Sequence, residues 1–371
     1  MVKFRRFVAW SGALFFGAAL LQAPQATSAS IGVTVKPPLP LTAYQGLACN
    51  VTDPRLKRIA LSNGVGPEAR VAAACWRLEW LSRNGVATPP VSVHASPQFP
   101  AWLVKRIEGA AAAGHRLFGR FADVSSYEVI ASVDPDYSCR IGKQVFDPRN
   151  YGKHFGLNSW TQAWNSGCVG SDYNPGAWTA SILGEGGREF IAWTLIRPEH
   201  RDMLKDRRVL GPTWFMGASS HEFVHSAQVQ RALESSNGME SIGRWFAEGQ
   251  AQYLGNTAAS LSIGPKDIRS AQLRQLQDVM REEGVTSIDI DAIGWNPRTR
   301  LVWPAGYFAY EWLVAHYGID ATFEWWGEWK EGCLEPGRGR CWRAKAEEMF
   351  GMDADTLLAK INAYVNAQVR Q

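Results

Sequence analysis

The stretch SSHEFVHSAQ, from Ser219 to Gln228, carries two histidines four positions apart and a glutamate directly after the first. On an α-helix, positions i and i+4 lie on one face a turn apart, so His221 and His225 can point at one metal ion. Glu222 would lie about 100° around that helix, where its carboxylate reaches a water molecule on the metal without binding the metal. Ser219 and Glu222 also match a capping box, in which the glutamate bonds back to the N-cap amide. The five-residue motif alone leaves both interpretations open.

A third metal ligand is expected from another helix, because a catalytic zinc site has three protein ligands and one open position. The segment RWFAEGQAQYL (244–254) places Glu248 twenty-three residues after His225, and the turn-forming run SSNG (235–238) lies between them. Two antiparallel helices joined by this turn would bring Glu248 opposite the histidines, and Gly249 would allow a close helix approach. Glutamates are usually solvated helix residues, but three aromatic residues flank this one: Trp245, Phe246 and Tyr253.

HEFVH (221–225) followed by WFAEGQAQY (245–253) resembles the gluzincin metallopeptidases, and especially the peptidase-MA-like group. The signature of that group is HExxH with a downstream W-x-x-E-G-x-A-x-Y segment. The resemblance covers roughly residues 100–370, since LVWPAGYFAYEWLVAHYG (301–318) and RAKAEEMFGMDADTLLAKINAYV (343–365) are similar to later helices of the group. It implies one zinc ion per chain, bound by His221, His225 and Glu248, with Glu222 as general base. Zinc lowers the pKa of a bound water to about 7, which makes hydroxide available near neutral pH.

The sequence departs from this group at two positions. Gln252 stands four positions after the third ligand, where an acidic residue usually orients a ligating histidine; its amide oxygen can still accept from an imidazole N–H. Trp303 stands where related aminopeptidases carry the tyrosine that stabilises the oxyanion. Tyr307, one helical turn later, is the preferred oxyanion donor, although Trp303 and Tyr307 are equally interpretable as core aromatics. Tyr310 and His316 are lower-ranked options.

The hydrophobic pattern predicts an α+β fold, with a small N-terminal helix-and-sheet lobe followed by a mainly helical lobe. The resemblance implies that the helical lobe is a zincin-type catalytic lobe. The site would lie in the cleft between the lobes. Strands are predicted at 127–133 and 189–196, with a proline-bearing loop at 88–100 and a loop-rich insertion at 134–186. The strand at 189–196 is placed at the sheet edge, where it could pair with an extended substrate. Helices are predicted at 53–85, 101–120, 213–234, 241–255, 265–283, 304–317, 320–330, 342–350 and 354–368.

Residues 1–29 have the pattern of a signal peptide, with three early basic residues, an apolar run at 7–21 and small residues before the cleavage point. The predicted division is then a helical, disulfide-linked segment at 30–100, which is a candidate pro-segment, an α+β lobe at 101–210, and a helical metallopeptidase lobe at 211–371. No segment after residue 29 is apolar for long enough to span a bilayer. A secreted or periplasmic location is expected.

The six cysteines all follow residue 29, and an even number in an oxidising compartment predicts three disulfides. Sequence neighbours give the simplest pairing, namely 49–75, 139–168 and 333–341. The formal charge of +4 falls to about +1 without residues 1–29, which hold three basic residues and no acidic ones. The chain has no concentrated basic face, so a nucleic-acid partner is not expected.

The predicted function is that of an exported zinc-dependent peptidase that hydrolyses a peptide or protein substrate. Three alternatives stay open: a zinc hydrolase with a non-peptide substrate, a catalytically impaired zincin-fold binding protein, and a tryptophan-rich binder of carbohydrate or cell wall with a fortuitous motif.

Overall fold

The computed structural model describes residues 77–78, 80–121, 123–145, 181–183, 189–195, 219–228, 243–263, 268–296, 299–328 and 341–370. The predicted signal peptide and the predicted boundary at 210/211 lie outside these residues. So does every predicted disulfide pairing, since no pair has both side chains in the described part. Among the described helices, none combines the length and the apolar character needed to cross a membrane.

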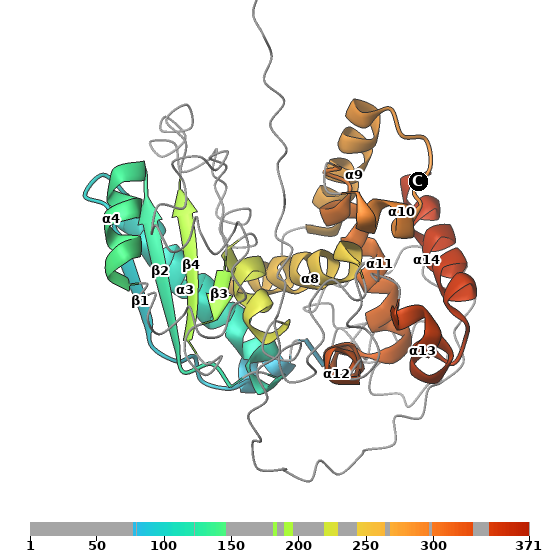
Figure 1. Ribbon diagram of the computed structural model, residues 1–371, viewed down its shortest axis with the longest axis horizontal. Coiled ribbons are helices and arrows are strands. Elements are labelled where there is room, and N and C mark those ends of the chain that lie inside the picture. The colour runs from blue at the N-terminus through green and yellow to red at the C-terminus, as the bar shows by residue number, and fades with distance from the viewer. Residues whose placement is uncertain are drawn as a thin grey trace, which may run out of the picture.

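A four-stranded sheet with the order β1-β2-β4-β3 forms one side of the molecule (Figure 1). β1 (Val91–Ala95) pairs with β2 (Ser126–Ser132), and β2 pairs with β4 (Glu189–Leu195), both in parallel; β3 (Ser181–Leu183) is antiparallel to β4. Helix α3 (Ala101–Phe118) connects the parallel strands β1 and β2, as parallel pairing requires a crossover. The strands predicted at 127–133 and 189–196 are therefore confirmed, and the fold is α+β.

Three predictions about this region are wrong. The segment 88–100 contains β1, because Pro90 still offers its carbonyl to the Tyr127 N–H at 2.9 Å, and an edge strand tolerates proline. The predicted insertion at 134–186 contains helix α4 (Pro135–Val145), where Asp134 accepts a hydrogen bond from the Asp136 N–H and proline occupies the first turn. β4 lies between β2 and β3 and is not an edge strand, so it is not free for the proposed substrate pairing.

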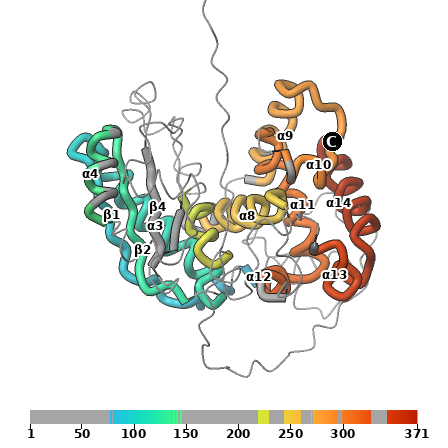
Figure 2. Tube along the Cα trace, viewed as in Figure 1, coloured from blue at the N-terminus to red at the C-terminus, as the bar shows by residue number. Residues whose placement is uncertain are grey.

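The helices after residue 243 follow the predicted pattern closely. The helix predicted at 241–255 runs eight residues further, and α10 was not predicted; its N-cap Asp289 accepts from the backbone N–H groups of Asp291 and Ala292. The chain trace passes from the sheet through α8 to these later helices (Figure 2). Their bounds are α8 (Arg244–Ile263), α9 (Ile268–Glu283), α10 (Ile290–Trp295), α11 (Val302–Tyr317), α12 (Ile319–Glu328), α13 (Cys341–Phe350) and α14 (Ala354–Val369).

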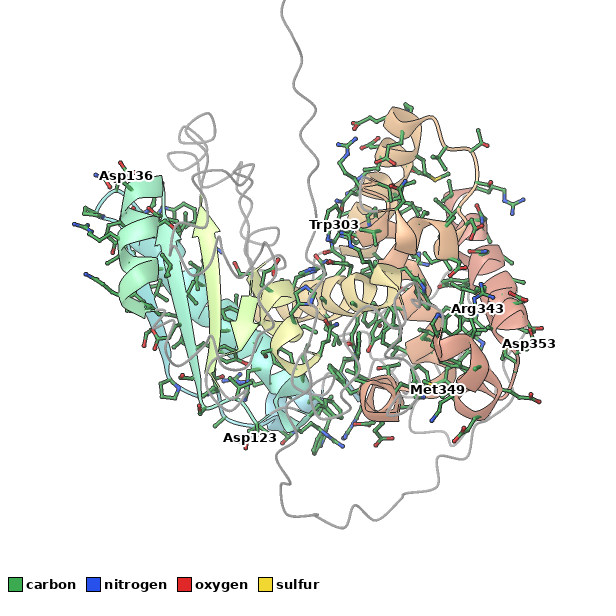
Figure 3. All side chains as sticks on the ribbon, in the orientation of Figure 1. Asp123, Asp136, Trp303, Arg343, Met349 and Asp353 are labelled. Atoms are coloured by element: carbon green, nitrogen blue, oxygen red, sulfur yellow. The ribbon has the colours of Figure 1, made fainter. Side chains whose placement is uncertain are left out.

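One hydrophobic core extends from α3 and β2 to α14. The central helix of the later part is α11, which is buried on all sides over most of its length. Its contact with α8 is made by backbone: a Cβ on Gly249 would lie 2.4 Å from the Gly306 carbonyl oxygen, and a Cβ on Gly306 would lie 2.8 Å from the Trp245 carbonyl oxygen. The close approach allowed by Gly249 is therefore to α11. It brings Trp303 beside α8, near the middle of the molecule (Figure 3).

Candidate metal centre

Residues 219–228 form a helix that is packed on the sheet side of the molecule. Ser219 and Ser220 are already helical, whereas an N-cap residue has non-helical geometry, so the capping box does not account for this motif. The Ser220 hydroxyl donates to the Ala110 carbonyl of α3 at 2.9 Å. Phe223 and Val224 are buried, and the Phe223 ring lies edge-on to the ring of Tyr127 from β2.

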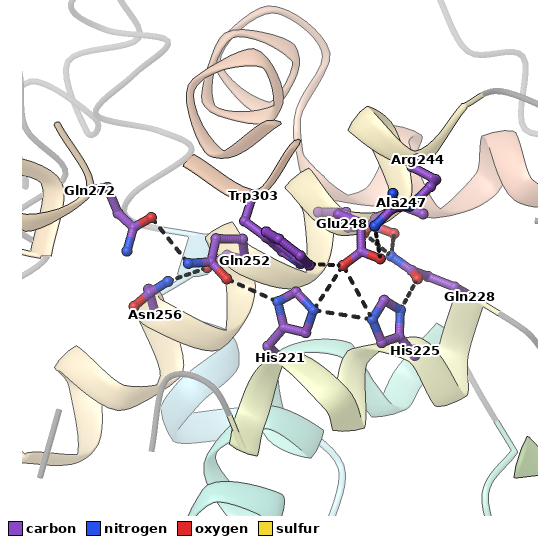
Figure 4. Close-up of polar contacts among 11 residues, drawn as sticks. His221, His225, Gln228, Arg244, Ala247, Glu248, Gln252, Asn256, Gln272 and Trp303 are labelled. Atoms are coloured by element: carbon purple, nitrogen blue, oxygen red, sulfur yellow. Dashed lines mark hydrogen bonds and ion pairs between the residues drawn. The ribbon is translucent and has the colours of Figure 1, made fainter. Parts of the chain in front are cut away.

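The two histidines of this helix converge with Glu248 of α8 (Figure 4). The Nε2 atoms of His221 and His225 are 3.2 Å apart, and the Glu248 Oε2 atom lies 3.2 Å from the first and 3.9 Å from the second. Tetrahedral bonds of about 2.0–2.1 Å to one zinc ion would separate the ligand atoms by about 3.3 Å. The cluster therefore has the donor types and the spacing that a metal ion requires.

Both histidines are oriented by the side-chain amide of a glutamine. The Nδ1 atom of His221 lies 3.1 Å from Gln252 Oε1, and the Nδ1 atom of His225 lies 2.7 Å from Gln228 Oε1. An amide oxygen only accepts, so each imidazole donates from Nδ1 and directs Nε2 into the cluster. The contact anticipated for Gln252 is present. Gln228 was missed, although its position three residues after His225 on the same helix was the signal for it.

Glu248 is held by groups from two helices. The indole N–H of Trp303 donates to its Oε2 atom at 2.9 Å, and the guanidinium of Arg244 lies 3.9 Å from its Oε1 atom. Burial opposes ionisation of this carboxyl, but the hydrogen bond with His221 and the nearby positive charges outweigh it and lower its pKa to about 2. Glu248 is therefore ionised at any working pH.

The two histidines differ in their affinity for protons. Burial lowers the pKa of His225 to about 4, and the charge of His221 adds to that effect. Burial also opposes protonation of His221, but the hydrogen bond to Glu248 and the negative charges of Glu222 and Glu248 raise its pKa above the ordinary value. The half-buried Glu222 thus acts electrostatically on the cluster without being one of its three donors.

The other candidate residues lie in the core of the helical part. The ring of Tyr307 is buried against Tyr253 and Phe308, at centroid distances of 5.2 and 5.1 Å, so its role as an oxyanion donor stays a prediction. The Tyr310 hydroxyl bonds to Gln250 and Thr322, and His316 stacks on Trp312; these contacts are those of core residues. Trp303 hydrogen-bonds to Glu248, a residue of the cluster.

No family model matches this chain, and neither a curated protein nor a solved structure matches it. The chemistry of the site is therefore inferred from its own residues and geometry.

Proposed function

We propose that this chain is a zinc-dependent peptidase of the gluzincin type, with residues 211–371 as its helical catalytic lobe. The observation that carries the proposal is the convergence of three donor atoms from two helices, the buried His221 Nε2 and His225 Nε2 and the half-buried Glu248 Oε2. Two histidines and a glutamate are a donor set that catalytic zinc sites use with a fourth, open position. The amide partners of both histidines support the same conclusion, because ligating histidines characteristically have such partners.

A zinc ion held by these residues supplies Lewis acidity toward a water molecule and toward a substrate carbonyl. Glu222 follows His221 directly in the sequence and is available to accept a proton from the attacking water and to pass it to the leaving amine nitrogen. The single N–H of Trp303 is donated to the Glu248 carboxylate, so Trp303 acts by holding that carboxylate at the cluster. Glu222 as a base is the feature that favours a hydrolase over a binding protein.

The proposal is tested by the zinc content of the purified chain, measured by elemental mass spectrometry. We expect about one zinc per chain, and its loss in His225→Ala and in Glu248→Ala. His94→Ala and Glu128→Ala are the matched controls, because this pair lies on the sheet at 2.7 Å and should not affect zinc. Absence of zinc after reloading the wild-type chain would overturn the proposal.

The activity is tested with a quenched-fluorescent peptide library. Glu222→Gln should retain zinc and lose cleavage by about 10²–10⁴-fold, the contribution typical of a general base. Stoichiometric zinc without cleavage of any peptide would reject the peptidase and leave a zinc hydrolase of another bond, or a binding protein. Cleavage that is unchanged in Glu222→Gln would reject the role of Glu222.

A further inference from the structure

A buried chain of hydrogen bonds runs from α12 to the metal site. The indole N–H of Trp326 donates to Gln250 Oε1 at 2.9 Å, and the Gln228 amide N–H₂ donates to the same oxygen at 2.8 Å. The Gln228 amide nitrogen also donates to the Ala247 carbonyl at 2.8 Å, while its oxygen faces His225 Nδ1 at 2.7 Å. Gln228 and Gln250 are fully buried, and Trp326 is nearly so. The three side chains of this hydrogen-bonded chain are therefore shielded from solvent.

The direction of donation along this series of hydrogen bonds is fixed at its two ends, by the indole of Trp326 and by the backbone carbonyl of Ala247. An indole N–H can only donate, so Gln250 must present its oxygen to Trp326. Its amide nitrogen then points the other way, to the Tyr310 hydroxyl at 3.0 Å. A backbone carbonyl can only accept, so Gln228 faces two acceptors, the Ala247 carbonyl and the Gln250 oxygen, and must present its nitrogen to both. Turning the Gln228 amide over would leave buried oxygen atoms against each other.

The orientation of Gln228 decides the state of His225. With its nitrogen committed to two acceptors, Gln228 offers His225 only an oxygen, so the imidazole must donate from Nδ1. A neutral imidazole has a single N–H, and with that proton on Nδ1 the lone pair is on Nε2. Nε2 is the atom that faces His221 and Glu248.

We propose that Trp326, Gln250 and Gln228 are positioning residues that hold His225 as the Nδ1–H tautomer and so keep its Nε2 ready for zinc. The proposal rests on the proposed metal site and not on the reaction that the site performs. It connects zinc affinity to the packing of α12 against α8, because one of the two groups that fix the direction, the Trp326 indole N–H, is on α12. Neutral histidine in water carries its proton mostly on Nε2, so the protein must impose the other tautomer.

The tautomer is read directly from long-range ¹H–¹⁵N NMR correlations of ¹⁵N-histidine-labelled, zinc-free protein at pH 8. We expect the wild-type His225 signals to show N–H at Nδ1 and a bare Nε2. This measurement needs no variant, so it does not depend on the tolerance of the core to substitution. An Nε2–H signal for His225 in the wild-type chain would overturn the proposal.

Trp326→Phe removes the donor and keeps most of the ring volume. Trp342→Phe is its matched control, because Trp342 is also fully buried but its indole nitrogen has no hydrogen-bond partner among the described residues. We expect Trp326→Phe, and likewise Gln228→Met, to mix the tautomers of His225 and to weaken zinc binding by about 10–100-fold, as loss of a histidine-orienting partner typically does. Trp342→Phe should change neither quantity.

The outcomes separate this proposal from the proposed function. An affinity and a tautomer in Trp326→Phe equal to those in Trp342→Phe would overturn the positioning role even in an active peptidase. Zinc binding that weakens as expected in a chain that cleaves no peptide would reject the peptidase and support the positioning role. A wild-type chain that binds no zinc would overturn both.

Discussion

Replacement of Gly249 by alanine tests whether backbone contact between α8 and α11 sets the geometry of the site. The added Cβ would lie 2.4 Å from the Gly306 carbonyl oxygen and 2.9 Å from its Cα, whereas ordinary contacts are 3.4–4 Å. The two helices would have to separate by about 1 Å, because a backbone obstacle cannot rotate away as a side chain can. Overpacking costs about 1–3 kcal/mol, and alanine returns about 0.5–1 kcal/mol of helix propensity. The 2.4 Å overlap with backbone puts the cost at the upper end of this range, so we expect a net loss of about 2 kcal/mol in the free energy of unfolding.

The same separation would change the geometry of the cluster formed by His221, His225 and Glu248, because Gly249 adjoins Glu248 and Gly306 lies one turn after Trp303. The 2.9 Å hydrogen bond between Trp303 and Glu248 crosses this interface and should lengthen. Urea unfolding of the metal-free chain measures the stability, and competition with a chelator measures zinc affinity, which should fall by about tenfold.

Gly114→Ala on α3 is the matched control for Gly249→Ala. Its Cβ would meet a side-chain atom of Phe118 at 3.1 Å, which can shift, so stability should change by less than about 1 kcal/mol. If Gly249→Ala is as stable as the wild type or more stable, the helix crossing is not limited by this contact and the reasoning is refuted.

Three further changes test the core and the site. Burial lowers the pKa of His115 to about 4 against an ordinary 6.5, so between these values the unfolded chain binds the proton and the folded chain does not. The free energy of unfolding should therefore fall as the pH drops through this window, by up to about 3 kcal/mol. Urea unfolding at several pH values should show this slope in the wild type and a flatter one in His115→Gln. Arg269→Met leaves the Glu311 carboxylate buried without its cation and should lower the free energy of unfolding by about 3–5 kcal/mol, measured by thermal unfolding. The double variant Arg269→Met, Glu311→Leu should recover most of this lost stability. Additive losses from the two substitutions would contradict this. Trp303→Phe removes the N–H donated to Glu248 and should lower zinc affinity by about tenfold with little change in stability, and an unchanged chelator competition would contradict it.

The cluster of His221, His225 and Glu248 could be predicted from the sequence because it follows from residue spacings within short segments. The four-residue spacing of His221 and His225 places both on one helix face wherever that helix lies. Glu248 and Gln252 repeat this spacing on the next helix, so one pair of facing turns brings together the third donor and the partner of His221. Spacings of this kind within two helices can be recognised without knowledge of the rest of the fold.

The remaining parts depend on contacts between distant segments. β1 is flanked by prolines and becomes a strand because β2 offers it a parallel partner, which the segment 88–100 does not reveal. The position of β4 inside the sheet depends on the short strand β3. The link from Gln250 to Trp326 joins residues 76 positions apart, and no local pattern indicates which buried glutamine will meet which indole.

These distant contacts explain why the cluster is held so firmly on both sides. The histidine helix is attached to the sheet side through Ser220, which donates to α3, and through Phe223, which packs on Tyr127 of β2. Glu248 is attached to the later helices through the glycine crossing of α8 with α11 and through the indole of Trp303. The site therefore lies where two separately anchored elements meet, and a bound ion would bridge them. The geometry of a metal site built in this way would depend on the fold as a whole. Substitutions far from His221, such as those at Trp326 and Gly306, should therefore change its affinity for zinc.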